Sequence, residues 1–333
     1  FGKRKGVVVT KSVLVTGGAG YIGSVVSRYL LHKGYKVRVM DSLIHGGQAL
    51  LGLYHENNFD FVCGDVREDT DITNSLEGID CVVHLAAIVG DPACARQPDI
   101  ARAVNLDGSM RLFQMAQNMG VSRFVFASTC SNYGKMIDTS DYVNEDSELR
   151  PISLYAENKV SVENMLLDVS QSNSISTTVL RLATAFGVSP RMRFDLTVNE
   201  FTMEIMVNQA LMVYGEQFWR PYVHVRDIAR AIDLVLGLAI DRVGGKVFNV
   251  GDTAQNYRKG EVVDLICSIV NNAAEIEYVE KEEDPRDYRV SFERIKSDLG
   301  FSATRSVSDG IREVAGVITQ GAITNFNNPY YRN

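Results

Sequence analysis

Short runs of apolar residues recur along the first half of the chain, and each run ends in small or polar residues. The first run, residues 13–15, is soon followed by Gly17, Gly20 and Gly23, and apolar residues then return at helical spacing within 25–30. A continuous apolar run is typical of a strand buried on both faces, and a 3.6-residue period is typical of an amphipathic helix. The pattern therefore predicts a buried parallel strand, a glycine turn and a helix, in that order.

The three glycines have the spacing that a dinucleotide pyrophosphate requires. Gly17 allows a tight turn, Gly20 lets the backbone approach the phosphates, and Gly23 lets the helix pack close to the strand. The N-terminus of the helix then faces the negative charge of the phosphates. Such a motif alone is a weak signal, but between a predicted strand and a predicted helix it indicates a dinucleotide site.

Further apolar runs predict the rest of a sheet, and helical patterns such as 98–119 and the segment opened by Pro151 lie between them. The expected strands are Lys36–Asp41, Phe59–Cys63, Cys81–His84, 124–127, 178–182 and Lys246–Val250. Alternating strands and helices indicate an α/β protein with a Rossmann-like, doubly wound parallel sheet. Ligands of such sheets bind outside the carboxyl ends of the strands.

The second strand ends in Asp41, and Ser42 and Leu43 follow it without a nearby arginine. A carboxylate at this position can accept hydrogen bonds from both hydroxyls of an adenine ribose and would repel a 2′-phosphate. The sequence therefore favours NAD over NADP as the cofactor.

Candidate chemistry follows the fourth and fifth strands. We interpret His84 on the fourth strand as a structural core residue. Hydroxyl side chains follow the fifth strand, and the helix after Pro151 carries Tyr155 and Lys159 on one face, four residues apart. We expect the Lys159 ammonium to lower the pKa of Tyr155. Such a tyrosine can take a proton from an alcohol while hydride leaves the carbon.

Composition excludes several classes of protein. The net charge of −7 over 333 residues argues against a nucleic-acid partner, and we interpret Lys3, Arg4 and Lys5 as a solvated tail. No apolar run reaches membrane-spanning length, and no signal peptide is visible. The five cysteines lack C-x-x-C spacing, so we expect reduced thiols in a cytoplasmic protein without a metal site.

Together these motifs resemble the extended short-chain dehydrogenase/reductase family, particularly its nucleotide-sugar epimerases and dehydratases. The resemblance covers nearly the whole chain. It rests on the glycine motif, Asp41, Gly64-Asp65-Val66, Leu85-Ala86-Ala87, Ser128 to Gly134, Tyr155 to Lys159, and Arg220-Pro-Tyr-Val-His-Val-Arg-Asp227.

The resemblance implies roles for these residues. Tyr155 would be the acid/base, Lys159 would hold the nicotinamide ribose, and Thr129 would assist the tyrosine. The cofactor contacts would be Gly17, Gly20, Tyr21, Ile22, Gly23, Asp41, Asp65, Val66, Leu85, Ala86, Ala87, Asn105, Ser128, Tyr155 and Lys159. The substrate contacts would be Ser131, Asn132, Thr184, Arg193, Asn199, Arg220 and Arg286.

Several substrate residues have other interpretations. Arg191, Arg193 and Asn199 together suit a diphosphate, but ordinary surface charge explains either arginine alone equally well. Arg286 lies in the acidic run 280–287, where local ion pairing is the alternative to a phosphate contact. Thr184 stands where the family usually has Asn, which leaves that contact open.

The chain order predicts two interleaved domains. Residues 11–182 would form the NAD-binding domain, with 220–250 returning to it, and residues 183–219 and 251–330 would bind the nucleotide sugar. The tail 327–331 could close over the site or fray. Helices 98–119 and 151–169 carry apolar residues on more than one face, and in the family these helices pair across a twofold axis, so we expect a homodimer.

We interpret the chain as an NAD-dependent nucleotide-sugar epimerase that acts through a transient 4-keto sugar. Members that expel water carry Asp-Glu directly after the catalytic threonine, where this chain has Cys130 and Ser131. Two alternatives stay open. One is a nucleotide-sugar 4-dehydrogenase or ketoreductase, for example on a GDP-heptose, which Arg181-Leu-Ala-Thr and Ser189-Pro-Arg-Met-Arg193 favour. The other is a non-catalytic protein that senses NAD.

Overall fold

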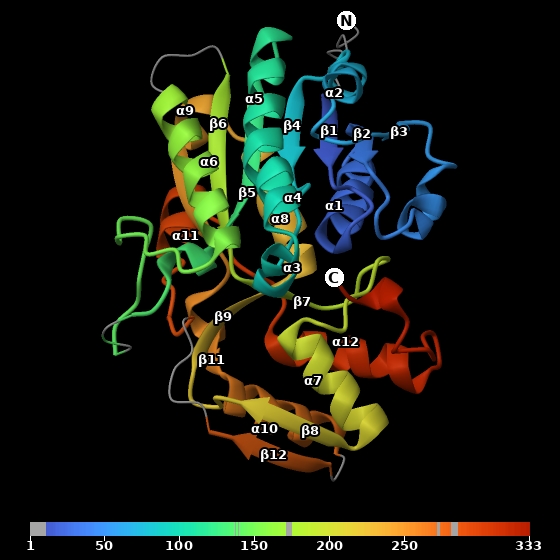
Figure 1. Ribbon diagram of the computed structural model, residues 1–333, viewed down its shortest axis with the longest axis vertical. Coiled ribbons are helices and arrows are strands. Elements are labelled where there is room, and N and C mark those ends of the chain that lie inside the picture. Colours follow the sequence, from blue (N-terminus) through green and yellow to red (C-terminus); the bar gives the residue numbers. More distant parts are fainter. Residues whose placement is uncertain (1–10, 137, 139, 171–174, 272–273, 281–285) are drawn as a thin grey trace, which may run out of the picture.

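The computed structural model describes residues 11–136, 138, 140–170, 175–271, 274–280 and 286–333. It consists of a large sheet with helices on both faces and a smaller part below it in Figure 1. The predicted basic tail, Lys3 to Lys5, lies outside the described residues, as do residues 281–285 of the acidic run 280–287. Within the described ranges, no helix is long and apolar enough to cross a membrane.

A parallel sheet of seven strands forms the centre of the large part. Its spatial order is β10 (Lys246–Val250), β6 (Ser176–Leu182), β5 (Arg123–Thr129), β4 (Cys81–His84), β1 (Ser12–Thr16), β2 (Lys36–Asp41) and β3 (Phe59–Cys63). All neighbouring strands are parallel. The order reverses between β1 and β4, so the loops after these strands diverge and leave a crevice. The predicted fold class is confirmed, and β5 continues beyond the expected 124–127 to Thr129.

Alternate residues of the central strand face two helical layers. Val13 and Val15 belong to the core cluster that contains residues of α1 (Tyr21–His32), α8 (Val225–Gly237) and α11 (Glu293–Leu299). Leu14 belongs to the opposite cluster, which contains residues of α2 (Asp69–Leu76), α5 (Ser109–Asn118) and α6 (Leu154–Ser170). Successive strand residues point to opposite faces, so both faces of the sheet are buried.

The expected long helix 98–119 is divided into segments. It consists of α4 (Pro98–Arg102), a π-helical turn η2 (Ala103–Gly108) and α5. Asn105 lies in the π-helical turn, where its side chain accepts a hydrogen bond from the Ile88 N–H (2.8 Å) and donates one to the Ile88 carbonyl (2.9 Å). We attribute the wider turn to this polar side chain, since π-turns are typical where a helix must admit one. The helix α6 begins at Leu154 rather than at Pro151.

The smaller part contains two small sheets. One has the order β11 (Asn256–Arg258), β9 (Trp219–His224), β7 (Thr184–Phe186), and the other pairs β12 (Glu275–Val279) with β8 (Ala210–Tyr214). Their apolar side chains share a core with α7 (Thr197–Met203), α10 (Lys259–Val270) and α12 (Val307–Thr319). Because β9 joins β7 and not the large sheet, the segment that returns to the large part begins with α8 at Val225 rather than at 220, and it continues through α9 (Ile240–Val243) to β10. The remaining elements are α3 (Asp91–Arg96), η1 (Gln48–Leu53), η3 (Cys130–Tyr133), η4 (Glu204–Asn208), η5 (Thr253–Gln255) and η6 (Pro329–Tyr331).

We predict opposite effects for two glycine-to-alanine substitutions in helices. A Cβ at Gly23 would lie 2.1 Å from the Gly17 carbonyl oxygen, so Gly23→Ala must separate α1 from the turn. We expect a loss of about 1–3 kcal/mol or more in unfolding free energy. The control, Gly316→Ala in α12, meets no heavy atom within 4 Å and should gain about 0.5–1 kcal/mol. Urea unfolding measures both; equal midpoints for Gly23→Ala and the parent chain would contradict the close packing.

Candidate active site

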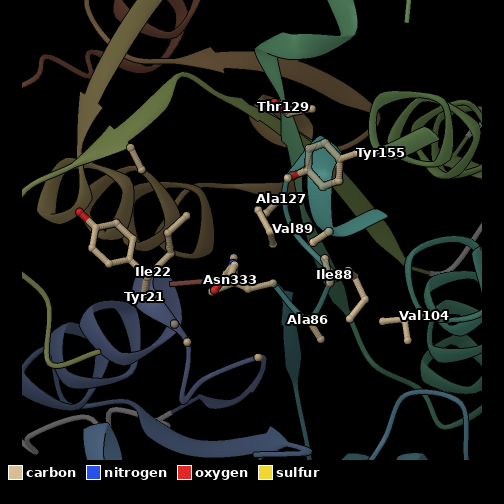
Figure 2. A pocket seen from close by; sticks show the side chains of 18 of the residues that line it. Tyr21, Ile22, Ala86, Ile88, Val89, Val104, Ala127, Thr129, Tyr155 and Asn333 are labelled. Atoms are coloured by element: carbon tan, nitrogen blue, oxygen red, sulfur yellow. The ribbon is translucent and has the colours of Figure 1, made fainter. Parts of the chain in front are cut away.

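A cavity of about 870 Å³ opens at the carboxyl ends of the strands, between the two parts of the molecule. The glycine turn and the ends of β2, β4 and β5 line one side, and segments of the smaller part line the other. Figure 2 shows Tyr21 and Ile22 on one side of this cavity and Ala86 and Ile88 on the other, with Thr129 and Tyr155 toward one end. The volume falls in the range of sites for small molecules and cofactors.

The glycine turn approaches the backbone of the neighbouring loop. Gly17 has a φ of 70°, and a Cβ there would lie 2.7 Å from the Ala86 nitrogen. Gly20 caps α1 without a side chain, and the first turn of α1 contains no acidic residue. The N-terminus of α1 therefore presents backbone to the cavity where a Cβ would intrude. This arrangement fits the pyrophosphate of a dinucleotide.

Asp41 is held at the rim of the same cavity by two backbone groups. Its carboxylate accepts hydrogen bonds from the Ala19 N–H (2.9 Å) and the Leu43 N–H (2.8 Å). Burial raises its pKa, and these two bonds oppose the rise. Asp65 also lines the cavity, but its carboxylate is engaged by Arg67, whose hydrogen bond lowers the pKa of Asp65. Asp41 is therefore the acid placed to bind a ribose.

Thr129, Tyr155 and Lys159 meet at one end of the cavity, together with Ser128. The Lys159 ammonium donates to the Ala127 carbonyl (2.8 Å) and lies 4.6 Å from the Phe126 ring centroid. It lies 5.9 Å from the centroid of the Tyr155 ring. The predicted hydroxyl cluster at the end of β5 is therefore brought together with the tyrosine and lysine of α6.

The expected lowering of the Tyr155 pKa is wrong for this structure. Burial raises the pKa of Tyr155, and Cys94 and Asp91 add to the rise while Arg193 opposes it. Burial also lowers the pKa of Lys159 to about 8. The reason is desolvation, which disfavours the charged form of both groups. The ammonium meanwhile donates to a main-chain carbonyl rather than to the phenol.

The predicted site residues divide into those that line the cavity and those behind it. Ser131, Thr184, Arg193 and Arg286 line it, as do all the predicted cofactor residues except Asn105. The remaining four lie outside the cavity lining and bond to their own surroundings: Asn105 to Ile88, Asn132 to Ser128 and Glu163, Asn199 to Gly187 and Arg193, and Arg220 to the Trp219 carbonyl.

A buried polar network lies behind the end of the cavity that Thr129 and Tyr155 line. Glu163 of α6 is fully buried and accepts hydrogen bonds from Arg181 (Nε, 2.9 Å) and from the Ser128 hydroxyl (3.0 Å). Arg181 also donates to the Tyr133 hydroxyl (2.9 Å), which donates to Asn249 (2.8 Å). The network joins α6, β5, β6 and β10, and so fixes the end of β5 relative to Tyr155.

Sequence reasoning missed other residues at the cavity. Asp91 pairs with Arg286 at 3.3 Å, so Arg286 has at least one partner from a distant segment of the chain. Tyr288 lines the cavity, and its hydroxyl lies 3.3 Å from the Ser131 hydroxyl. Its position two residues after Arg286 is the one signal that could have found it, because alternate residues of an extended segment share a face.

The C-terminal tail covers part of the cavity. The Phe194 N–H donates to the Tyr331 carbonyl (2.9 Å), and the Asn333 N–H donates to Asp195 (3.1 Å). Figure 2 shows Asn333 between Ile22 and Ile88. Of the two alternatives for 327–331, the structure favours closure over the site.

His84 and the cysteines have no place among the reacting groups. His84 is fully buried between the hydroxyls of Thr16 (2.7 Å) and Ser109 (2.8 Å), and burial lowers its pKa to about 3. It is a core residue, as predicted. The cysteines are free thiols. Over the described part of the chain, no group of three or more His, Cys, Asp or Glu could hold a metal ion.

Comparison with known proteins relates this geometry to a family. The model of the NAD dependent epimerase/dehydratase family matches residues 13–251. A dTDP-glucose 4,6-dehydratase of Streptomyces griseus is 31% identical, over 91% of this chain and 92% of its own length. A UDP-glucose 4-epimerase of Halalkalibacterium halodurans is 28% identical, over 87% and 90%. The crystal structure of a Thermus thermophilus UDP-glucose 4-epimerase complex with NAD has a TM-score of 0.82 and 26% identity, covering 94% of this chain and all of that one (100%).

We predict that Asp41 sets a preference for NAD over NADP. Asp41→Ala should weaken NAD binding about ten- to a hundredfold, because hydrogen bonds to a charged group contribute about 1.5–3 kcal/mol. It should narrow the difference in affinity between the two cofactors. Calorimetric titration of nucleotide-free protein measures both. The control is Asp60→Ala, an exposed carboxylate on the neighbouring strand β3. Tighter binding of NADP than NAD by the parent chain would contradict the prediction.

Proposed function

Since the chain belongs to the NAD-dependent epimerase/dehydratase family, we propose that it is a nucleotide-sugar epimerase acting through a transient 4-keto sugar. The observation that carries the proposal is the meeting of Thr129, Tyr155 and Lys159 in the cavity that the glycine turn and Asp41 also line. NAD, the cofactor of this family, accepts a hydride at its nicotinamide when bound. The residues of this chain would bind and orient the substrate and transfer its proton.

We assign the proton transfer of the reaction to Tyr155. Its phenolic oxygen would take the proton of the sugar hydroxyl at C4 as hydride leaves that carbon, and would return the proton later. Because burial raises its pKa, the tyrosine needs positive charge nearby to act as a base. Arg193 acts on Tyr155 in this direction. Lys159, whose ammonium lies 5.9 Å from the centroid of the Tyr155 ring, would add to it when protonated. Thr129 would hydrogen-bond the substrate oxygen.

We propose that residues 183–219 and 251–330 form the part of the molecule that binds the substrate. Arg193 and Arg286 line the cavity on that side and offer positive charge to a diphosphate, with Ser131 and Thr184 as polar contacts. Asn132, Asn199 and Arg220 lie outside the cavity lining, so we assign them to support of these segments. UDP-glucose and dTDP-glucose are the first probes, because relatives are named for them.

Dehydration is the less favoured reaction of the family. The Cys130 thiol donates to the Arg181 carbonyl (3.3 Å), and burial raises the pKa of this thiol. Ser131 bears a hydroxyl, which is a poor general acid near neutral pH. Asp91, a carboxylate that lines the cavity and acts on Tyr155, is paired with Arg286. We therefore propose that the product keeps its oxygen at C6.

The other two candidates differ from the proposal in identifiable ways. A 4-dehydrogenase or ketoreductase would use the same three residues and release the reduced cofactor with the keto sugar. A protein that only senses NAD would have no use for Tyr155 and Lys159 beside each other in the cavity. We place the reaction in the cytoplasm, for which the free cysteines are the support.

We propose a homodimer and predict a mass twice the 36.9 kDa of one chain by light scattering at micromolar concentration. Of the apolar residues on helices 98–119 and 151–169, Phe113 and Leu166 are buried within the chain, whereas Met110, Met115 and Met165 are only half-buried. Met165→Lys should place a charge in the interface and lower the mass toward one chain. A monomeric mass for the parent chain would refute the dimer.

We predict that Tyr155→Phe lowers turnover at least about 10²–10⁴-fold, because it removes the acid/base and keeps the ring. NAD binding should stay unchanged. Lys159→Met should lower turnover and weaken NAD binding as well, because a donor to the nicotinamide ribose is lost. The control is Tyr54→Phe, an exposed tyrosine of the large part. The assay follows conversion of a sugar nucleotide by NMR, which also shows whether the C6 oxygen is kept.

Rapid mixing separates the remaining reactions. An epimerase should show at most a transient reduced nicotinamide, which disappears as the second isomer forms, whereas a dehydrogenase should accumulate it. Turnover of Tyr155→Phe at the parent rate would show that the proposed mechanism is wrong.

A further inference from the structure

One arginine of the smaller part lies among the residues of the cofactor cleft. Arg191 is 1% exposed, yet it belongs to the cavity lining together with Gly20, Asp41 and His45. It acts electrostatically on Asp41, which precedes it by 150 positions in the sequence. The side of the cavity that the smaller part forms therefore brings positive charge to the ribose-binding carboxylate.

The segment that carries Arg191 is attached directly to the first turn of α1. The Ser189 hydroxyl donates to the Tyr21 carbonyl (2.7 Å) and lies 3.1 Å from the Ser24 hydroxyl. The Tyr21 hydroxyl in turn donates to the Gly187 carbonyl (2.6 Å). These contacts are buried, so they fix the segment relative to the N-terminus of α1, where a pyrophosphate would bind.

The guanidinium of Arg191 has an N–H donor that no protein group accepts among the described residues. One terminal nitrogen donates to the Arg332 carbonyl (3.0 Å), and the Tyr330 ring centroid lies 6.0 Å from the guanidinium carbon. The Nε atom is buried without a hydrogen-bond partner. Across the described residues, Arg191 pairs with no carboxylate within 4.0 Å. A buried cation without a counter-charge is costly and is usually compensated by an anion.

The electrostatics of the cleft favour an anionic ligand. Burial and, to a smaller extent, the neighbouring Arg193 lower the pKa of Arg191 to about 10. The same two arginines act on His45, whose pKa burial lowers to about 4. Arg193 is itself paired with Asp195 (2.9 and 2.8 Å), and Asp41 has its own backbone donors. The Arg191 guanidinium and the N-terminus of α1 are therefore the groups in this space that can attract an anion.

We infer that Arg191 binds a pyrophosphate oxygen of the dinucleotide cofactor, opposite the N-terminus of α1. The adenine ribose that Asp41 would hold carries this phosphate on its 5′ carbon, so the carboxylate and the guanidinium would grip adjoining groups of one ligand. A guanidinium suits a phosphate because its donors form a planar fork. The contact would be the same in an epimerase and in a 4-dehydrogenase, because it involves the adenosine half of the cofactor and not the sugar.

The test compares ligands with and without the pyrophosphate. Arg191→Met should weaken the binding of NAD and of ADP-ribose about ten- to a hundredfold, as expected for the loss of one charge-assisted hydrogen bond. The affinity for adenosine should stay unchanged. Calorimetry on nucleotide-free full-length protein measures the first two ligands, and ligand-observed NMR measures adenosine. The control is Arg312→Met, whose side chain is 62% exposed on α12.

Three results would overturn the inference. One is unchanged ADP-ribose binding in Arg191→Met. Another is an equal loss of affinity for adenosine and for ADP-ribose, which would show that Arg191 only shapes the cleft. The third is a loss confined to NADP, which would place a 2′-phosphate beside Arg191 instead. Arg191→Lys keeps the charge and should lose less affinity than Arg191→Met. Thermal unfolding without ligand verifies that both variants fold.

Discussion

A buried ion pair between α6 and β6 holds the reacting end of the site together. Glu163 is one turn beyond Lys159 on α6, and it bonds both Arg181 of β6 and Ser128 of β5. Removing one partner of such a pair leaves a buried charge and typically costs about 3–5 kcal/mol. The geometry of Tyr155 relative to Thr129 therefore depends on a contact that touches neither residue. The Tyr133 hydroxyl extends the same network to Asn249 of β10.

The cavity is completed from two directions, and each supplies one kind of chemistry. The large sheet contributes the glycine turn, Asp41 and the strand ends, which suit a dinucleotide. The smaller part contributes Arg193, and the segment 286–292, which packs on the core of the large sheet, contributes Tyr288 and the Arg286 that pairs with Asp91. The segment from Gly187 to Asp195 belongs to both halves, because it bonds to the start of α1 and to the C-terminal tail. Motion of this segment would change both halves of the site together.

Local patterns were enough to predict the sheet, the glycine turn and the position of Asp41, because each depends on neighbouring residues. The place of Asn105 in a π-turn was hidden, since its partner Ile88 lies outside the helical pattern. For Arg191 the sequence left a diphosphate contact and ordinary surface charge open, because nothing in the sequence connects it with Asp41. The Tyr155 pKa was misjudged because spacing on a helix reports which groups are near and not how far they are desolvated. Contacts between distant segments decided each of these cases.

We propose that hydride leaves C4 and returns to it within one site. Deuterium at C4 of the sugar nucleotide that turns over tests this proposal. We expect the label to stay at C4 in a product of inverted configuration, with none in solvent and none in released cofactor. Recovery of the label in free reduced cofactor, together with an unlabelled keto sugar, would contradict it.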